Sequence, residues 1–154
     1  MDGGCPLLLL DTNIVLDWLA FDDAAVRPIS AAITAREVRL ISSPAGVAEL
    51  QRALAYKAIG LDAPAQAQVL EVFLRHALLR DDPPEGASAM LPRCDDRDDQ
   101  KFLELAWHAG ARWLVSRDKA LLKLAAQVAR MGRFGIIAPP GFSAALAARG
   151  SSAA

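Results

Sequence analysis

The sequence predicts an α/β fold, in the form of a three-layer α/β/α sandwich with a mostly parallel central sheet. Short apolar segments alternate with longer segments of helical periodicity along most of the chain. The first apolar segment, residues 7–10, consists only of leucine, as expected for a strand that is covered on both faces. The composition is 53% hydrophobic but only 6% aromatic, which favours helices over an all-β sandwich.

Each expected strand is a short apolar run, and the runs lie at residues 7–10, 38–42, 111–116 and 134–139. The loop-like stretch between the fourth and fifth helices offers one more short strand, at either 78–81 or 87–91. The expected helices begin at Asp, Ser or Pro and end at Gly or at a polar turn. They span residues 11–21, 28–37, 44–59, 65–79, 118–132 and a helix from 98 or 99 to 109.

The length of 154 residues fits one domain of ordinary size, and no internal repeat or linker divides it. We expect residues 1–143 to form this single domain. Residues 144–154 end in small and polar side chains, so we expect them to form a flexible tail.

The charge balance excludes some partners. A formal net charge of −1 and a pI near 6.1 argue against a protein that holds duplex DNA through a strongly basic surface. The two cysteines, Cys5 and Cys94, form no metal-binding pair, and no secretory segment is recognisable, so we expect reduced thiols and a cytoplasmic protein. The apolar run at 7–10 is too short to span a bilayer, which predicts no membrane partner.

Four acidic residues recur where expected strands end or helices begin, namely Asp11, Glu49, Asp99 and Asp118. Ligands of parallel sheets bind outside the carboxyl ends of the strands, so we expect these side chains to converge there. Each acid also has a local explanation, because a helix N-cap contributes about 1 kcal/mol and a lone Glu on a helix is usually solvated. Four clustered carboxylates would repel one another without a cation. The pattern therefore predicts a site for Mg²⁺ or Mn²⁺.

The motifs around these acids resemble those of the PIN-domain ribonucleases, which include the VapC-like toxins of bacterial toxin–antitoxin pairs. LLLLDTNIVLDWL is similar to the opening strand and acid of the family, and SSPAGVAEL to its second acidic block. DDRDDQKFLELAWHAGARWLVSRDKALL resembles the C-terminal acidic block, and IIAPPGF resembles the last strand. The resemblance spans about residues 7–143.

The resemblance implies a divalent-metal-dependent endoribonuclease that cuts phosphodiester bonds with metal-activated water. It assigns both catalysis and metal coordination to Asp11, Glu49, Asp99 and Asp118. Whether one or two ions bind stays open. Cleavage would leave 5′-phosphate and 3′-hydroxyl ends.

The resemblance also implies accessory residues. Asp96 is expected as an additional acid, with Asp95 and Asp98 as alternatives for local roles. Asn13 would hold Asp11 or a bound water by hydrogen bonding, and Ser116 would act in the same way near Asp118.

One position departs from the family pattern. The family commonly has Thr-Gly-Asp where this chain has Ser116, Arg117 and Asp118. Arg117 has two interpretations: a contact to a substrate phosphate, or a side chain that faces solvent.

The partners implied are an RNA substrate, a cognate antitoxin protein and, as is common in the family, a second copy of the chain. The alternative function is a catalytically inactive PIN-like module that binds RNA or protein. A phosphatase of the haloacid-dehalogenase type would need a second Asp where the chain has Asn13, and the acids and lysine of a response-regulator receiver have no convincing counterparts. No phosphate-binding glycine loop is present.

Overall fold

The structure, a computed structural model, describes residues 4–84 and 88–152. Its strands form a five-stranded sheet with the order β3-β2-β1-β4-β5, in which every pairing is parallel. The strands are β1 (Leu7–Leu10), β2 (Arg39–Ser42), β3 (Leu78–Leu79), β4 (Ala111–Val115) and β5 (Gly135–Ile137).

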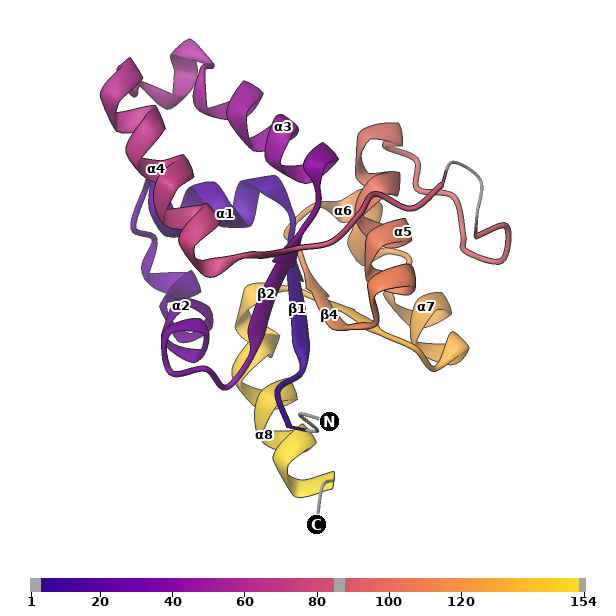
Figure 1. The fold of residues 1–154 in the computed structure, drawn as a ribbon. Helices are drawn as coiled ribbons and strands as arrows, with labels where there is room; N and C mark the ends of the chain where they lie inside the picture. The colour runs from indigo at the N-terminus through magenta and orange to yellow at the C-terminus, as the bar shows by residue number, and fades with distance from the viewer. Residues whose placement is uncertain (1–3, 85–87, 153–154) are drawn as a thin grey trace.

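Helices connect the strands and cover the sheet (Figure 1). The α-helices are α1 (Thr12–Leu19), α2 (Arg27–Thr34), α3 (Pro44–Leu54), α4 (Ala63–His76), α5 (Gln100–Ala109), α6 (Lys119–Leu122), α7 (Ala125–Met131) and α8 (Phe142–Ser152). Short 3-10 turns are η1 (Ala24–Val26), η2 (Lys57–Ile59), η3 (Arg97–Asp99) and η4 (Pro139–Gly141). Within the described ranges, no helix is long and apolar enough to cross a membrane.

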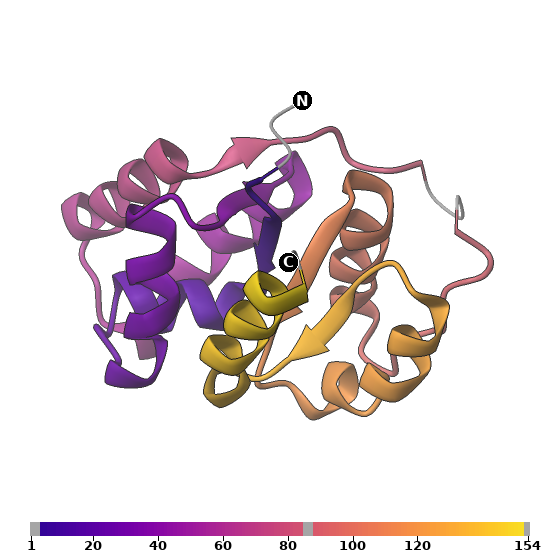
Figure 2. The same cartoon turned by 90° about the horizontal axis from the view of Figure 1, so that it is seen from below.

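The sheet has a hydrophobic core on each face, which confirms the three-layer α/β/α sandwich. Leu8 and Leu10 belong to one core, together with side chains of α1 to α4 and Phe142 of α8. Leu9 belongs to the other core, with side chains of α5, α6 and α7. This alternation follows from the two-residue period of a strand, and Figure 2 shows the two helical layers on either side of the sheet. Burial on both faces explains why the sequence of β1 is entirely leucine.

The order of the strands creates a switch point between β1 and β4. From β1 the chain moves outward through β2 and β3, and it then returns to β4 on the other side of β1. The connections after β1 and β4 therefore leave in different directions, α1 on one face and α6 on the other. Crevices of this kind, at the carboxyl ends of the strands, are where open α/β sheets bind ligands.

Two predicted helices are interrupted in the structure. The helix predicted at 118–132 divides into α6 and α7, and the helix predicted at 44–59 ends at Leu54 before the separate turn η2. Leu124 is buried at the break between α6 and α7, so packing against the second core sets the path there rather than a Gly or Pro. The predicted stops at Gly110 and Gly132 are present, with left-handed φ angles of 77° and 79°.

The C-terminal segment is helical where the sequence predicts a flexible tail at residues 144–154. Residues 142–152 form α8, because Phe142 is buried in the first core and Leu146 packs against it. The short strand lies at Leu78–Leu79, within the first of the two alternatives. Position 87 of the other alternative lies outside the described residues, and Ser88 to Leu91 form a turn.

Candidate metal centre

The four predicted acids line one cavity at the carboxyl ends of the strands. Asp11 follows β1 directly and caps α1, whereas Asp118 follows β4 and caps α6. Asp99 ends η3 ahead of α5, and Glu49 lies in α3. The cavity has a volume of about 350 Å³, and we call it the acidic pocket. It is lined by Asp11, Thr12, Asn13, Glu49, Arg52, Ala53, Tyr56, Asp96, Asp98, Asp99 and Asp118.

Asp11 is held by two donors. Its Oδ1 accepts a hydrogen bond of 3.1 Å from the backbone N–H of Ile14, and its Oδ2 accepts one from the hydroxyl of Ser116. The same hydroxyl accepts a bond of 2.9 Å from the backbone N–H of Asp118. Ser116 is fully buried and thus joins the ends of β1 and β4. Ser116, which was predicted as an accessory residue, thus lies at this junction beside Asp11 and Asp118.

Burial raises the pKa of Asp11 to about 6, although the hydrogen bonds from Ser116 and Ile14 act against this rise. The negative charges of Asp118 and Glu49 raise this pKa further. A carboxylate with a pKa this close to neutrality is suited to proton transfer.

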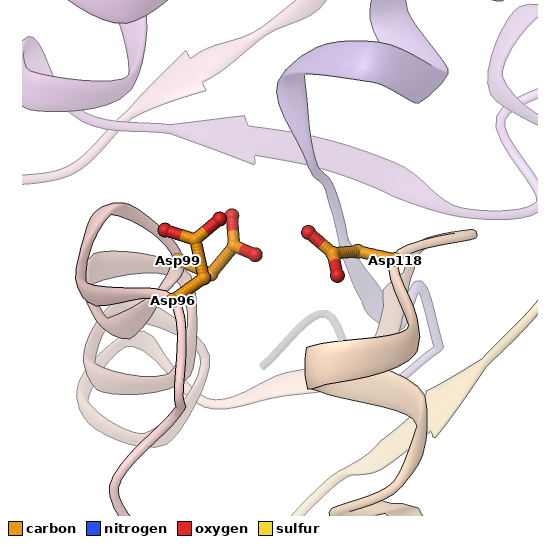
Figure 3. A group of neighbouring side chains, drawn as sticks. All are labelled: Asp96, Asp99 and Asp118. Carbon is orange, nitrogen blue, oxygen red and sulfur yellow. The ribbon is translucent and has the colours of Figure 1, made fainter.

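Three carboxylates converge on one point of the pocket. One oxygen each from Asp96, Asp99 and Asp118 lies within 4.8 Å of the other two. Figure 3 shows Asp96 and Asp99, which lie at the turn η3 just before α5, pointing towards Asp118, which comes from the loop before α6. Asp96 also accepts a bond of 3.0 Å from the N–H of Asp98, which fixes the turn η3. The accessory acid predicted at Asp96 is thus part of the convergent group.

The electrostatics of this group show that it lacks positive charge. Burial raises the pKa of Asp99 to about 8, and sharing of a proton with Asp118 and the charges of Asp118, Asp96 and Asp11 add to the rise. The same shared proton, helped by the N–H of Ala120, lowers the pKa of Asp118. In addition, Asp99 Oδ2 is buried and has no hydrogen-bond partner within the described residues. A buried acceptor without a donor is costly.

These observations fit a hard divalent cation. Carboxylate oxygens are the ligands that Mg²⁺ and Mn²⁺ prefer, and a cation would satisfy the oxygen of Asp99 that has no partner. Without a cation, a proton held by Asp99 relieves the repulsion. The residues that fit the cation directly are therefore Asp96, Asp99 and Asp118.

Glu49 lies in the same pocket, but other groups occupy both of its carboxylate oxygens. The hydroxyl of Thr12 donates to Oε2, and the ammonium group of Lys101 forms an ion pair with Oε1. The ligand role predicted for Glu49 stays a prediction. Sequence reasoning did not identify Thr12, and it gave Lys101 no specific role. The position of Lys101, two residues after Asp99 in the first turn of a helix, was the only available signal.

The remaining predicted residues have other surroundings. Asn13 is exposed and lines the pocket, but no bond from its side chain to Asp11 is found in the part of the chain that the structure describes. Arg117 forms ion pairs with Asp17 and Asp23, which neither of its two interpretations anticipated. Its substrate contact stays a prediction.

A second, larger cavity of about 1170 Å³ adjoins the acidic pocket, and Asp98 lines both. It extends along the loop before η3 and the first turns of α5. Three of its lining residues are basic: Arg93, Arg97 and Lys101.

Comparisons with known proteins agree with this architecture. The family model described as PIN domain matches residues 8–120. The VapBC2 complex from Rickettsia felis, solved with a DNA fragment from its promoter, contains a similar chain with a TM-score of 0.57 and 16% identity. That match covers 86% of this chain and 98% of the other. PAE2754 from Pyrobaculum aerophilum has a TM-score of 0.60 and 22% identity over 96% of this chain and 94% of its own. The search of curated proteins gave no match.

Proposed function

The chain belongs to the PIN-domain family, and from this premise we propose that it is a divalent-metal-dependent endoribonuclease. The observation that carries the proposal is the convergence of Asp96, Asp99 and Asp118 at the switch point of the sheet, with one buried oxygen of Asp99 left without a partner. Structural groups rarely leave such an oxygen unpaired.

In this mechanism, Asp96, Asp99 and Asp118 would hold Mg²⁺ or Mn²⁺, and Asp11 would supply a fourth carboxylate of the pocket. When bound, the cation would lower the pKa of a water molecule and would stabilise negative charge on the phosphodiester. Asp11 lines the same pocket and would be placed to accept a proton from the attacking water. Ser116 and Ile14 keep this carboxylate in position through the two hydrogen bonds described above.

We further propose that the substrate is RNA and that the protein is the toxin of a toxin–antitoxin pair. The resemblance of the motifs to VapC-like toxins supports this role, and the shared fold with a chain of the VapBC2 complex is compatible with it. An antitoxin would then be the natural partner, and it would block the acidic pocket. Homodimerisation and a cytoplasmic location remain expectations from the same resemblance.

The test is a cleavage assay with the purified chain, freed of any partner, on structured RNAs and single-stranded DNA in Mg²⁺, Mn²⁺ or EDTA. The variants are Asp11→Asn and Asp99→Asn. Asp62→Asn is the matched control, since Asp62 also caps a helix, α4, but lies outside the pocket. We expect cleavage of RNA that needs the metal, disappears in the first two variants and persists in the control.

Cleavage that persists in EDTA or in Asp99→Asn would contradict the proposal. If the wild-type chain neither cleaves nor binds Mn²⁺, the alternative of an inactive binding module is favoured.

A further inference from the structure

Lys101 is a cation that the chain itself places among the acids of the pocket. Its ammonium group forms an ion pair with Glu49 Oε1 and donates a bond of 2.5 Å to the backbone carbonyl of Asp98. The side chains of Lys101 and Glu49 are only 26% and 21% exposed, so the pair is largely shielded from solvent. Ion pairs that are partly removed from water are stronger and less screened than pairs on the surface.

Each carboxylate oxygen of Glu49 already has a partner from the chain. One oxygen is taken by Lys101 and the other by the hydroxyl of Thr12. The packing of α3 against α5 keeps the carboxylate and the ammonium group together. A divalent ion bound at Glu49 Oε1 would compete with the ammonium group of Lys101 for that oxygen, whereas Asp99 Oδ2, in the group of Asp96, Asp99 and Asp118, has no hydrogen-bond partner within the described residues.

We propose that Lys101 takes the place of a second metal ion, so that the chain binds one divalent ion at Asp96, Asp99 and Asp118 and uses the lysine ammonium on the Glu49 side. This inference rests on the proposed metal-dependent function, and it answers how many ions that function uses. An ammonium group has the positive charge that this side of the pocket needs, and it is already present when no metal is bound.

The position of Lys101 also suits contact with a phosphodiester. An ammonium group has three donors, and Glu49 and the carbonyl of Asp98 account for two of them. Lys101 also lines the larger cavity, beside Arg93 and Arg97. The ammonium group also lies 5.2 Å from the centroid of the Phe102 ring. Lys101 thus connects the larger cavity, which it lines, with Glu49, which lines the acidic pocket.

The test counts Mn²⁺ ions per chain by isothermal titration calorimetry, with free Mn²⁺ measured in parallel by electron paramagnetic resonance. The variants are Lys101→Met, which removes the charge, and Lys101→Arg, which keeps it. Lys123→Met is the matched control, because Lys123 pairs with Asp95 outside the acidic pocket. Thermal unfolding of each variant establishes that it is folded.

We expect one Mn²⁺ for the wild type, Lys101→Arg and Lys123→Met, and two for Lys101→Met. The second ion should disappear again in the double variant Lys101→Met, Glu49→Gln. Two ions in the wild type, or one in a folded Lys101→Met, would overturn the inference. No Mn²⁺ binding by the wild type would instead overturn the proposed function itself, so the two failures are distinguishable.

Discussion

The buried carboxylates on the two sides of the acidic pocket have different kinds of partners. On one side, which we call the bonded side, Asp11 and Glu49 receive donors from the chain. On the other, the open side, Asp96, Asp99 and Asp118 face one another, and Asp99 keeps an oxygen without a partner.

Burying a carboxylate costs free energy unless it is paired, so the donors of the bonded side offset part of this cost without any ligand. On the open side, Asp99 Oδ2 has no donor among the described residues, and a proton or a cation would relieve its cost. The difference supports our proposal that the carboxylates of the open side hold the metal. It also predicts that the two sides respond differently to metal, pH and mutation.

The largest effect is expected at the open side. Asp99→Asn should lower cleavage by at least about 100-fold, because even residues that only orient metal ligands typically contribute 10- to 100-fold. The same variant should lose most of the stabilisation by Mn²⁺, which at 100 times the dissociation constant amounts to about 2.7 kcal/mol in the wild type. Chemical denaturation with and without Mn²⁺ measures this difference. Equal stabilisation of both proteins would place the ion elsewhere.

The second-largest effect is expected in the pH dependence of the free energy of unfolding, which should differ between the two sides. In EDTA, the folded chain holds a proton on Asp99 up to about pH 8, whereas an unfolded Asp loses it near 3.8. The folded state therefore binds more protons in this range, and the free energy of unfolding should fall as pH rises from about 4 to about 8, by roughly 2–4 kcal/mol. The raised pKa of Asp11 acts in the same direction up to about pH 6.

Asp99→Asn should flatten this profile above pH 6, where Asp11 no longer contributes. Saturating Mn²⁺ should flatten it as well, because the cation replaces the proton. Denaturation curves across the pH range check both expectations. A stability that rises with pH in EDTA would mean that the open side is not short of positive charge.

A smaller effect is expected when a hydrogen bond of the bonded side is removed. Ser116→Ala removes the hydroxyl that joins Asp11 to the backbone of Asp118, and it leaves a buried carboxylate with one donor fewer. We expect a loss of about 1–3 kcal/mol in the free energy of unfolding, with or without Mn²⁺. Ser30→Ala is the control, since its hydroxyl bonds only to a carbonyl of its own helix. A loss seen only in the presence of Mn²⁺ would show that Ser116 serves the metal rather than the fold.

The smallest effect concerns the loop that carries Asp118. Arg117→Ala breaks the ion pairs with Asp17 and Asp23, but the guanidinium side chain is 41% exposed. We therefore expect a loss below about 1 kcal/mol that shrinks further at high salt. Cleavage measured in parallel tests the remaining role in substrate binding. A large increase in KM with unchanged stability would establish that role.

The same contrast explains how much of the site the sequence could predict. Asp11 follows β1 directly and Asp118 follows β4 after two intervening residues, so their place at the sheet edge follows from the parallel topology. Asp96 and Asp99 lie in one acidic run, and it was the family resemblance that favoured them over Asp95 and Asp98; the local pattern did not show which members of the run face Asp118. That choice depends on the turn η3, which directs both towards the loop before α6.

The partners of Glu49 were beyond prediction for a related reason. Its contact with Lys101 depends on the packing of α3 against α5, two helices that are far apart in the sequence. The fold itself was predictable from alternating apolar and helical segments. The break at Leu124 and the helix α8 were not, because tertiary packing rather than a local stop signal determines them.

The most direct test of the account is a crystal structure of the chain soaked in Mn²⁺, with the ion located by anomalous scattering. We predict one ion bound by Asp96, Asp99 and Asp118, with Lys101 still paired to Glu49. A crystal with no ion at this group, or with an ion at Glu49 and Lys101 displaced, would contradict it.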